Sequence, residues 1–200
     1  MHERTLAVIA LLVVVPSAGC LGVVDSATSP TGTPPVETVA ACAGDLERLD
    51  ADGTNGSLPD RNAGFAIDVT RTTVSRGGEL QITLENVADE PRGTGPSRMF
   101  VLQRHVGDEW RTVLGTPTGR AGWNATLLIH EPGEGFTWNL TASVSGFSTR
   151  GYEVCGALPA DEYRFVYFGL VETGTDGRLD SPAGDTFVGP SVAVRFRLVE

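Results

Sequence analysis

Lysine is absent from this sequence of 200 residues, so all 15 basic residues are arginines. The 25 aspartates and glutamates outnumber them and give a formal net charge of −10. Binding to nucleic acid requires a basic stripe that neutralises phosphates, and the sequence offers none. The composition therefore excludes a nucleic-acid-binding protein, and the length allows one medium-sized domain with tails.

An acidic surface without lysine resembles that of proteins from halophilic archaea. At molar salt the Debye length falls to about 3 Å, so the charges repel one another little and mainly keep the surface hydrated. The alternative is an ordinary acidic protein.

Long apolar runs are also lacking. The run from Leu6 to Val15 is too short to cross a bilayer, which needs about 20 residues, and is typical of a signal peptide. The residues that follow, Pro16 to Cys20, resemble a bacterial or archaeal lipobox, although Ser17 stands where a Leu or Val is usual. The resemblance implies a signal peptide over residues 1–19, a diacylglyceryl group on Cys20 and anchoring to the outer face of the cell membrane. The alternative is a plain signal peptide.

Residues 20–38 are predicted to form a flexible tether. Ten of the 13 residues from Ser26 to Thr38 are Ser, Thr, Pro or Gly, and no core can be built from them. Behind a lipid anchor, such a segment holds a domain away from the membrane.

Cysteine is scarce, and only Cys42 and Cys155 remain once Cys20 is assigned to lipid. An exported chain meets an oxidising compartment, so this pair predicts one disulfide. This bond would close a loop spanning 113 residues, since 155 − 42 = 113. In the chain-entropy model, closing a loop of that length stabilises a fold by roughly 4 to 5 kcal/mol. We expect the bond to hold an N-terminal extension, residues 39–64, against the body of the domain. The alternative is two separate thiols.

The rest of the chain shows short alternating runs separated by Gly, Pro, Asn and Asp, and helical periodicity is confined to Val39 to Leu49. The expected strands are Ala66 to Thr70, Thr73 to Ser75, the run around Leu80 to Leu84, Arg98 to Val106, Glu109 to Leu114, Ala125 to His130, Gly135 to Val144, Glu162 to Glu172 and Ser191 to Val199. We count the first two as one split strand, so seven or eight strands predict an all-β fold, an Ig-like antiparallel β-sandwich over residues 65–200.

Alternation within these runs predicts which side chains face the core. Those expected to face inward are Leu80, Ile82, Leu84, Leu127, Ile129, Phe136, Trp138, Leu140, Val192, Val194, Phe196 and Leu198. Arg195 and Arg197 are expected to face outward.

Four features in order resemble the Ig-like domains of prokaryotic cell-surface lipoproteins of the haloarchaeal type. They are Gln81 to Asn86, Val101 to Arg104 followed by Gly107 to Trp110, the turn Glu131 to Glu134, and Leu158 to Phe165. The resemblance covers about residues 65–200 and implies an Ig-like fold, with no reaction and no cofactor. Asp161 departs from it, since the family pattern prefers Gly there. Tyr163 resembles a tyrosine corner, whose hydroxyl bonds to backbone upstream.

Three N-glycosylation sequons begin at Asn55, Asn124 and Asn139. Five Asn together with 32 Ser and Thr predict only about 0.8 such sequons by chance. Strand alternation turns Asn124 and Asn139 outward. We predict N-glycosylation at all three positions; the alternative is a chance excess.

Enzyme motifs are lacking: the sequence has no G-x-S-x-G, H-E-x-x-H or C-x-x-C. His105 and His130 are expected to be surface residues of strands. A blue-copper site is excluded because neither His nor Met follows Cys155. We therefore predict no catalytic activity, no metal and no cofactor.

Two further segments are candidate binding sites. Glu172 to Asp185 carries Asp176, Asp180 and Asp185 among glycines and is predicted to be a solvated acidic loop, with Ca²⁺ binding as the alternative. Trp123, in a Gly-flanked connection, is the candidate for stacking on a sugar or peptide, with core packing as the alternative.

These features predict a non-catalytic, lipid-anchored extracellular Ig-like domain that acts as a binding or assembly module of an archaeal cell envelope. Its expected partners are envelope proteins or glycans. The alternative is an inhibitor or accessory protein of a secreted enzyme, presenting an end loop such as Gly115 to Gly122. A small-molecule carrier would need a cavity, which a filled sandwich rarely has.

Overall fold

The computed structural model describes residues 38–51, 53–119, 126–172 and 189–200, which lie in one compact unit spanning Val36–Glu200. The predicted signal peptide, Cys20 and the tether as far as residue 37 lie outside the described residues.

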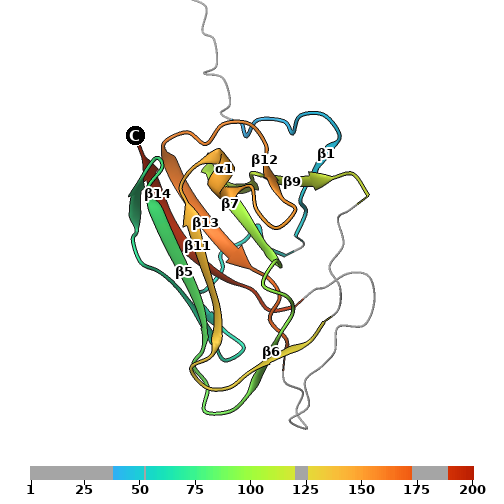
Figure 1. The fold of residues 1–200 in the computed structure, drawn as a ribbon, viewed down its shortest axis with the longest axis vertical. Coiled ribbons are helices and arrows are strands. Elements are labelled where there is room, and N and C mark those ends of the chain that lie inside the picture. The colour runs from blue at the N-terminus through green and yellow to red at the C-terminus, as the bar shows by residue number, and fades with distance from the viewer. Residues whose placement is uncertain (1–37, 52, 120–125, 173–188) are drawn as a thin grey trace, which may run out of the picture. The chain divides into compact units, whose positions relative to one another are not determined.

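The fold is all-β and is built around two sheets that pack face to face as a sandwich (Figure 1). The first sheet has the order β11-β5-β3-β2 and consists of β2 (Arg61–Asn62), β3 (Phe65–Val69), β5 (Glu79–Asn86) and β11 (Gly135–Thr141). The second has the order β4-β14-β13-β7-β8 and consists of β4 (Thr73–Ser75), β7 (Phe100–Val106), β8 (Glu109–Thr112), β13 (Asp161–Tyr167) and β14 (Val192–Val199). Pairing is antiparallel except between β14 and β4, which run parallel.

The expected count of seven or eight strands is too low, because the described residues contain 14. Five of them form two small sheets built from the connections. One has the order β1-β9-β12 and consists of β1 (Leu46–Arg48), β9 (Leu114–Pro117) and β12 (Glu153–Val154). The other pairs β6 (Arg92–Thr94) with β10 (Leu128–His130). A single turn of helix, α1 (Val144–Phe147), follows β11.

The core between the two main sheets follows the predicted alternation. On β5, Leu80, Ile82 and Leu84 are at most 1% exposed. Trp138 of β11 packs against Phe165 of β13, with ring centroids 5.0 Å apart. Phe165 in turn stacks on Phe100 of β7, at 4.6 Å. The aromatic side chains of both sheets therefore meet in one interior.

The central strands β7 and β13 are buried on both faces, which simple alternation does not predict. Val101 and Val166 point away from the sandwich core, yet both are fully buried. The N-terminal extension, residues 39–64, covers this outer face: Leu49 and Ala51 are buried, and the Ala193 amide donates to the Pro59 carbonyl at 2.9 Å. Near-continuous apolar runs are typical of strands covered on both sides.

The predicted disulfide between Cys42 and Cys155 is present, and it ties this extension to the body. The bond packs on Gly115 of β9, where an added Cβ would lie 2.9 Å from the Cys155 Sγ. Gly115 is therefore a buried strand residue and not part of an exposed end loop, which corrects the segment proposed for the inhibitor alternative.

The helical periodicity of Val39 to Leu49 does not produce a helix. Gly44 adopts a φ of +64°, and residues 46–48 pair with β9 as β1.

The segment around β10 departs most from expectation. Leu127 and Ile129 are 40% and 49% exposed, so the prediction that they face inward is wrong, and His130 is buried instead. The turn Glu131 to Glu134 forms as predicted, with the Glu134 amide donating to the Glu131 carbonyl. However, it joins β10 and β11, which belong to different sheets, so β10 does not follow the inward pattern of the sandwich.

Candidate functional site

Arg164 is the most deeply buried charged residue described, with 1% of its surface exposed. It projects from β13 into the layer between the sheet and the N-terminal extension. Its Nε donates to the Gln103 Oε1 at 2.7 Å, its Nη1 donates to the Gly56 carbonyl at 2.7 Å, and its Nη2 donates to the Thr54 carbonyl. The guanidinium therefore fastens the segment around Thr54 to the sheet.

Trp110 lies between two arginines on the same face. The Arg164 Cζ is 4.4 Å from its ring centroid and the Arg195 Cζ is 5.3 Å away. Burial, together with the nearby positive charge of Arg195, lowers the pKa of Arg164 to about 10. Because the donors of Arg164 are already engaged by backbone and amide oxygens, we interpret this cluster as structural.

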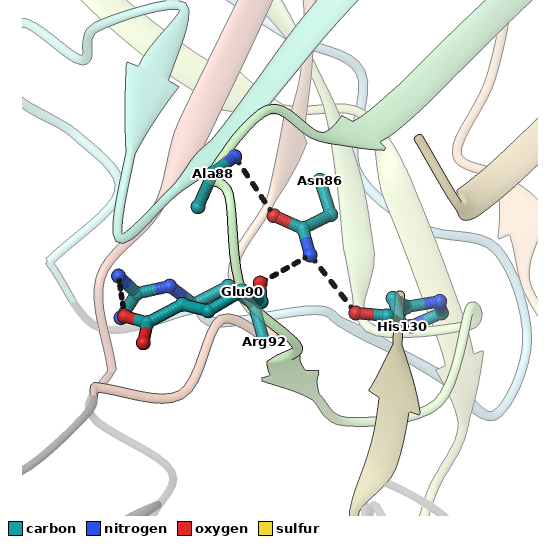
Figure 2. A network of polar contacts seen from close by, with 5 residues as sticks. All are labelled: Asn86, Ala88, Glu90, Arg92 and His130. Atoms are coloured by element: carbon teal, nitrogen blue, oxygen red, sulfur yellow. Dashed lines mark hydrogen bonds and ion pairs between the residues drawn. The ribbon is translucent and has the colours of Figure 1, made fainter. Parts of the chain in front are cut away.

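His130 and Asn86 form a second polar cluster, at the end of the sandwich near β6 (Figure 2). The Asn86 Nδ2 donates to the carbonyls of Glu90 and His130, each at 2.9 Å, and its Oδ1 accepts from the Ala88 amide at 3.0 Å. Arg92 pairs with the Glu90 carboxylate at 2.6 Å. Asn86 thus joins the end of β5 to β10 and to the loop before β6.

The ring of His130 is packed between the rings of Phe65 and Phe136, and its Nε2 lies 2.8 Å from the Thr94 Oγ1. Burial lowers its pKa, and the nearby Glu134 carboxylate partly opposes that shift. A hydroxyl beside an imidazole is the start of a nucleophilic site. However, Thr94 is fully buried and His130 is 7% exposed, so no substrate reaches the pair in this conformation. The prediction of a surface histidine was wrong here, whereas His105 is half-buried against Trp110.

Asn139 lies on the outward face of the first sheet, on β11, as the alternation predicts. Its Oδ1 accepts a hydrogen bond from the Gln81 Nε2 on β5 at 2.8 Å. An open groove of about 400 Å³ surrounds it. The groove has a mixed lining of hydroxyl, amide, charged and apolar side chains, from Thr70, Arg71, Glu79, Leu80, Gln81, Asn139, Leu140 and Thr141. The groove is open to solvent, unlike the two buried polar clusters described above.

The other predicted site residues divide into two groups. Asn55 is exposed, and its Oδ1 accepts from the Gln103 Nε2 at 3.4 Å. Tyr163 donates its hydroxyl to the Pro159 carbonyl, four residues upstream, at 2.9 Å, and burial raises its pKa to about 12. The second group lies outside the described residues: Cys20, Trp123, Asn124, Asp176, Asp180 and Asp185.

Sequence reasoning missed Arg164 and Asn86. Arg164 lies inside an apolar run and Asn86 occupies an inward position at the end of an alternating strand, and a buried polar group needs partners from elsewhere in the chain. The sequence did contain a signal for Arg164, because it is the one charged residue in the otherwise apolar run from Tyr163 to Phe168. Asp161, the departure from the family pattern, pairs with the Arg104 Nε at 2.6 Å.

Within the described ranges, no cluster of three or more His, Cys, Asp or Glu side chains is arranged to hold a metal ion. The same residues contain no helix that is long and apolar enough to span a membrane.

No protein-family model and no curated protein matches this chain. Among solved structures, the chain is similar to a β-glucosidase from Listeria innocua, determined in complex with gluconolactone, at 12% identity and a TM-score of 0.30. The match covers 68% of this chain and 16% of that enzyme. A likeness of this size carries no argument about the function of this chain.

Proposed function

We propose that this chain is a non-catalytic, lipid-anchored domain on the outer face of an archaeal cell, where it serves as a binding or assembly module of the cell envelope. The observation that carries the proposal is the disulfide between Cys42 and Cys155. Disulfides persist in oxidising compartments, so the bond supports export, as does the signal-peptide pattern that ends at Cys20. The anchor precedes the tether, and the tether leads directly into the extension held by Cys42.

A non-catalytic role is supported by the state of the polar clusters. Arg164 is occupied by the backbone of the extension, and the Thr94–His130 pair is closed off from solvent. In both places the hydrogen bonds hold parts of the domain together, which is the use that buried polar groups usually have.

The surface that we propose for binding is the outward face of β10. Ile129 lies on β10 and Leu127 directly precedes the strand, and both are among the exposed large apolar side chains described. The ribbon β6–β10 lies outside the two main sheets, at one end of the sandwich (Figure 1). End loops and ribbons of Ig-like domains are common binding surfaces.

The first experiment tests the anchor. Native cells that carry the full chain are fractionated, with Cys20→Ser as the matched variant. We expect the parent chain in the membrane fraction and open to protease added outside the cell, and the variant released from that fraction. A full-length parent chain in the soluble cytosol would contradict the proposal.

The second experiment tests the binding surface, by cross-linking intact envelopes and identifying the partners. Peptides from surface-layer or transporter proteins support an assembly module, whereas peptides from a secreted protease favour the inhibitor alternative. Ile129→Asp should abolish the cross-links, while Val144→Asp, at another exposed apolar position, on α1, should leave them unchanged. Equal cross-linking by both variants would remove β10 as the surface.

A further inference from the structure

The sandwich has one long strand edge that no other described strand covers. β11 is the outermost strand of the first sheet and contains seven residues. The remaining edges of the two main sheets are short or charged: β2 has two residues, β4 has three, and β8 carries exposed Glu109 and Arg111. Short strands and charged side chains are the devices that prevent an edge from pairing with another chain.

The hydrogen-bond register shows which backbone groups face this edge. The Asn86 amide donates to the Glu134 carbonyl, and the Ala142 amide donates to the Gly78 carbonyl, at the two ends of the β5–β11 ladder. Hydrogen-bonded pairs alternate along an antiparallel ladder, so the even-numbered residues of β11 direct their N–H and C=O groups at β5. The backbone groups of Thr137 and Asn139 therefore point outward from the sheet.

The sequence of β11 does nothing to block pairing at this edge. Gly135 to Thr141 contains no charged residue and no proline, and the ladder with β5 runs without a bulge through all seven residues. An uncharged, regular edge of this length is a template for strand addition by a second chain.

The sequon, Asn139 to Thr141, occupies the C-terminal end of this edge. Asn139 and Thr141 are two residues apart on an extended strand, so both side chains lie on the same exposed face. Gln81 holds the Oδ1 of Asn139, and since the two atoms of an amide diverge from Cγ, the Nδ2 is directed away from Gln81. The groove lies on the Gln81 side of Asn139, over β5 and the Thr70–Arg71 segment that follows β3, so the Nδ2 faces the open edge of β11 and not the groove.

We propose that Asn139 carries an N-linked glycan that covers the open edge of β11 and keeps it from pairing with another strand. The inference rests on the export proposed above. The donor is an oligosaccharide linked through phosphate to a lipid. A bond forms between the Asn139 Nδ2 and C1 of the sugar, the bond between C1 and the phosphate oxygen breaks, and the proton from Nδ2 leaves with the lipid phosphate.

The test uses the full chain made in its native host, with two variants at one position. Thr141→Ala destroys the sequon and Thr141→Ser preserves it, while both keep Asn139 and a small exposed side chain. We expect glycopeptide mass spectrometry to find a glycan on Asn139 in the parent chain and in Thr141→Ser, and a bare Asn139 in Thr141→Ala. The detergent-solubilised proteins are then compared by sedimentation in molar salt, where repulsion between the acidic copies is screened.

The parent chain and Thr141→Ser should remain monomeric, whereas Thr141→Ala should lose roughly half or more of its monomer as concentration rises. Adding Thr137→Lys to Thr141→Ala should restore the monomer, because a charge then blocks the bare edge. This rescue separates edge pairing from misfolding, which a lysine would not repair.

A bare Asn139 in chains that are lipidated and membrane-bound would overturn the glycan and leave the proposed function intact. A glycosylated parent whose Thr141→Ala variant stays monomeric would overturn the shielding role. Chains found unprocessed in the cytosol would overturn both this inference and the proposed function.

Discussion

Arg164 is a buried cation whose described partners are all uncharged. Its hydrogen bonds reach Gln103 within the sheet and two carbonyls of the N-terminal extension. Burying a charge is costly unless its donors are satisfied, and here the ring of Trp110 adds a favourable face. In return, the directional hydrogen bonds of Arg164 hold the extension in one position on the sheet. Apolar packing alone would fix that position less specifically.

Arg164→Met should therefore destabilise the fold by about 3 kcal/mol, because it leaves buried acceptors without donors. Chemical denaturation measures the change. Arg195→Ala is the matched control: its guanidinium lies over the same ring, but its side chain is 56% exposed, so its effect should stay within about 0.5 kcal/mol. Equal losses in the two variants would show that burial of Arg164 is not the cause.

His130 predicts a sensitivity to acid. Burial lowers its pKa below the usual 6.5, so the unfolded chain takes up the proton at a higher pH than the folded chain. The free energy of unfolding should thus be highest above pH 6.5 and should fall as the pH drops below that value. His130→Gln should remove this component of the pH dependence, since glutamine stays neutral.

Denaturation curves recorded on both sides of pH 6.5 measure this effect. His105→Gln removes one histidine from a half-buried position on β7 and should leave the acid-sensitive component in place. If His130→Gln and the parent chain lose the same stability on acidification, the burial of His130 does not contribute.

The N-terminal extension acts as a layer of the fold in its own right. Leu49 and Ala51 pack on the outer face of the second sheet, β1 pairs with β9, and β2 pairs with β3. The disulfide fixes one end of this layer and Arg164 fixes a point further along it. Two independent attachments are what a layer of short strands needs, because a strand of two or three residues is not stable by itself.

The double variant Cys42→Ser, Cys155→Ser should lower the free energy of unfolding by about 5 kcal/mol, the chain-entropy value for closing a loop across 113 positions. Hydrogen exchange should show the loss first in β1 and β9, while β5 and β11 keep their protection until global unfolding. Simultaneous loss of protection in all four strands would show that the extension is not a separate layer.

The whole molecule carries a net charge of −10 without a single lysine. Repulsion among the acidic groups opposes the compact state at low ionic strength and is screened when the Debye length falls from about 10 Å at 0.1 M salt to about 3 Å at 1 M. The melting temperature should therefore rise over this range of NaCl. A sucrose series controls for exclusion of solute from the surface, and a melting temperature that does not change with NaCl would contradict the prediction of a halophilic protein.

Much of the sandwich could be predicted from short-range pattern. The alternation of Leu80, Ile82 and Leu84 requires one buried face, and the hairpin residues at Gly107 fix the register of β7 and β8. The hydrogen bond of Tyr163 to upstream backbone could also be predicted, from its place at the start of a strand. The disulfide could be predicted from the number of cysteines and an oxidising compartment. The prediction failed at Leu127 and Ile129, where alternation cannot tell which of two opposite faces meets the body.

The sequence alone determined the all-β class, the two faces of the longest strands and the pairing of two cysteines, since these follow from periodicity and from counting. Only the tertiary structure decided that the extension covers the second sheet, that His130 is inside and that β11 ends the first sheet with an open edge. Those facts depend on which segments meet across long stretches of chain, and the physical forces that bring them together leave no local periodic signal.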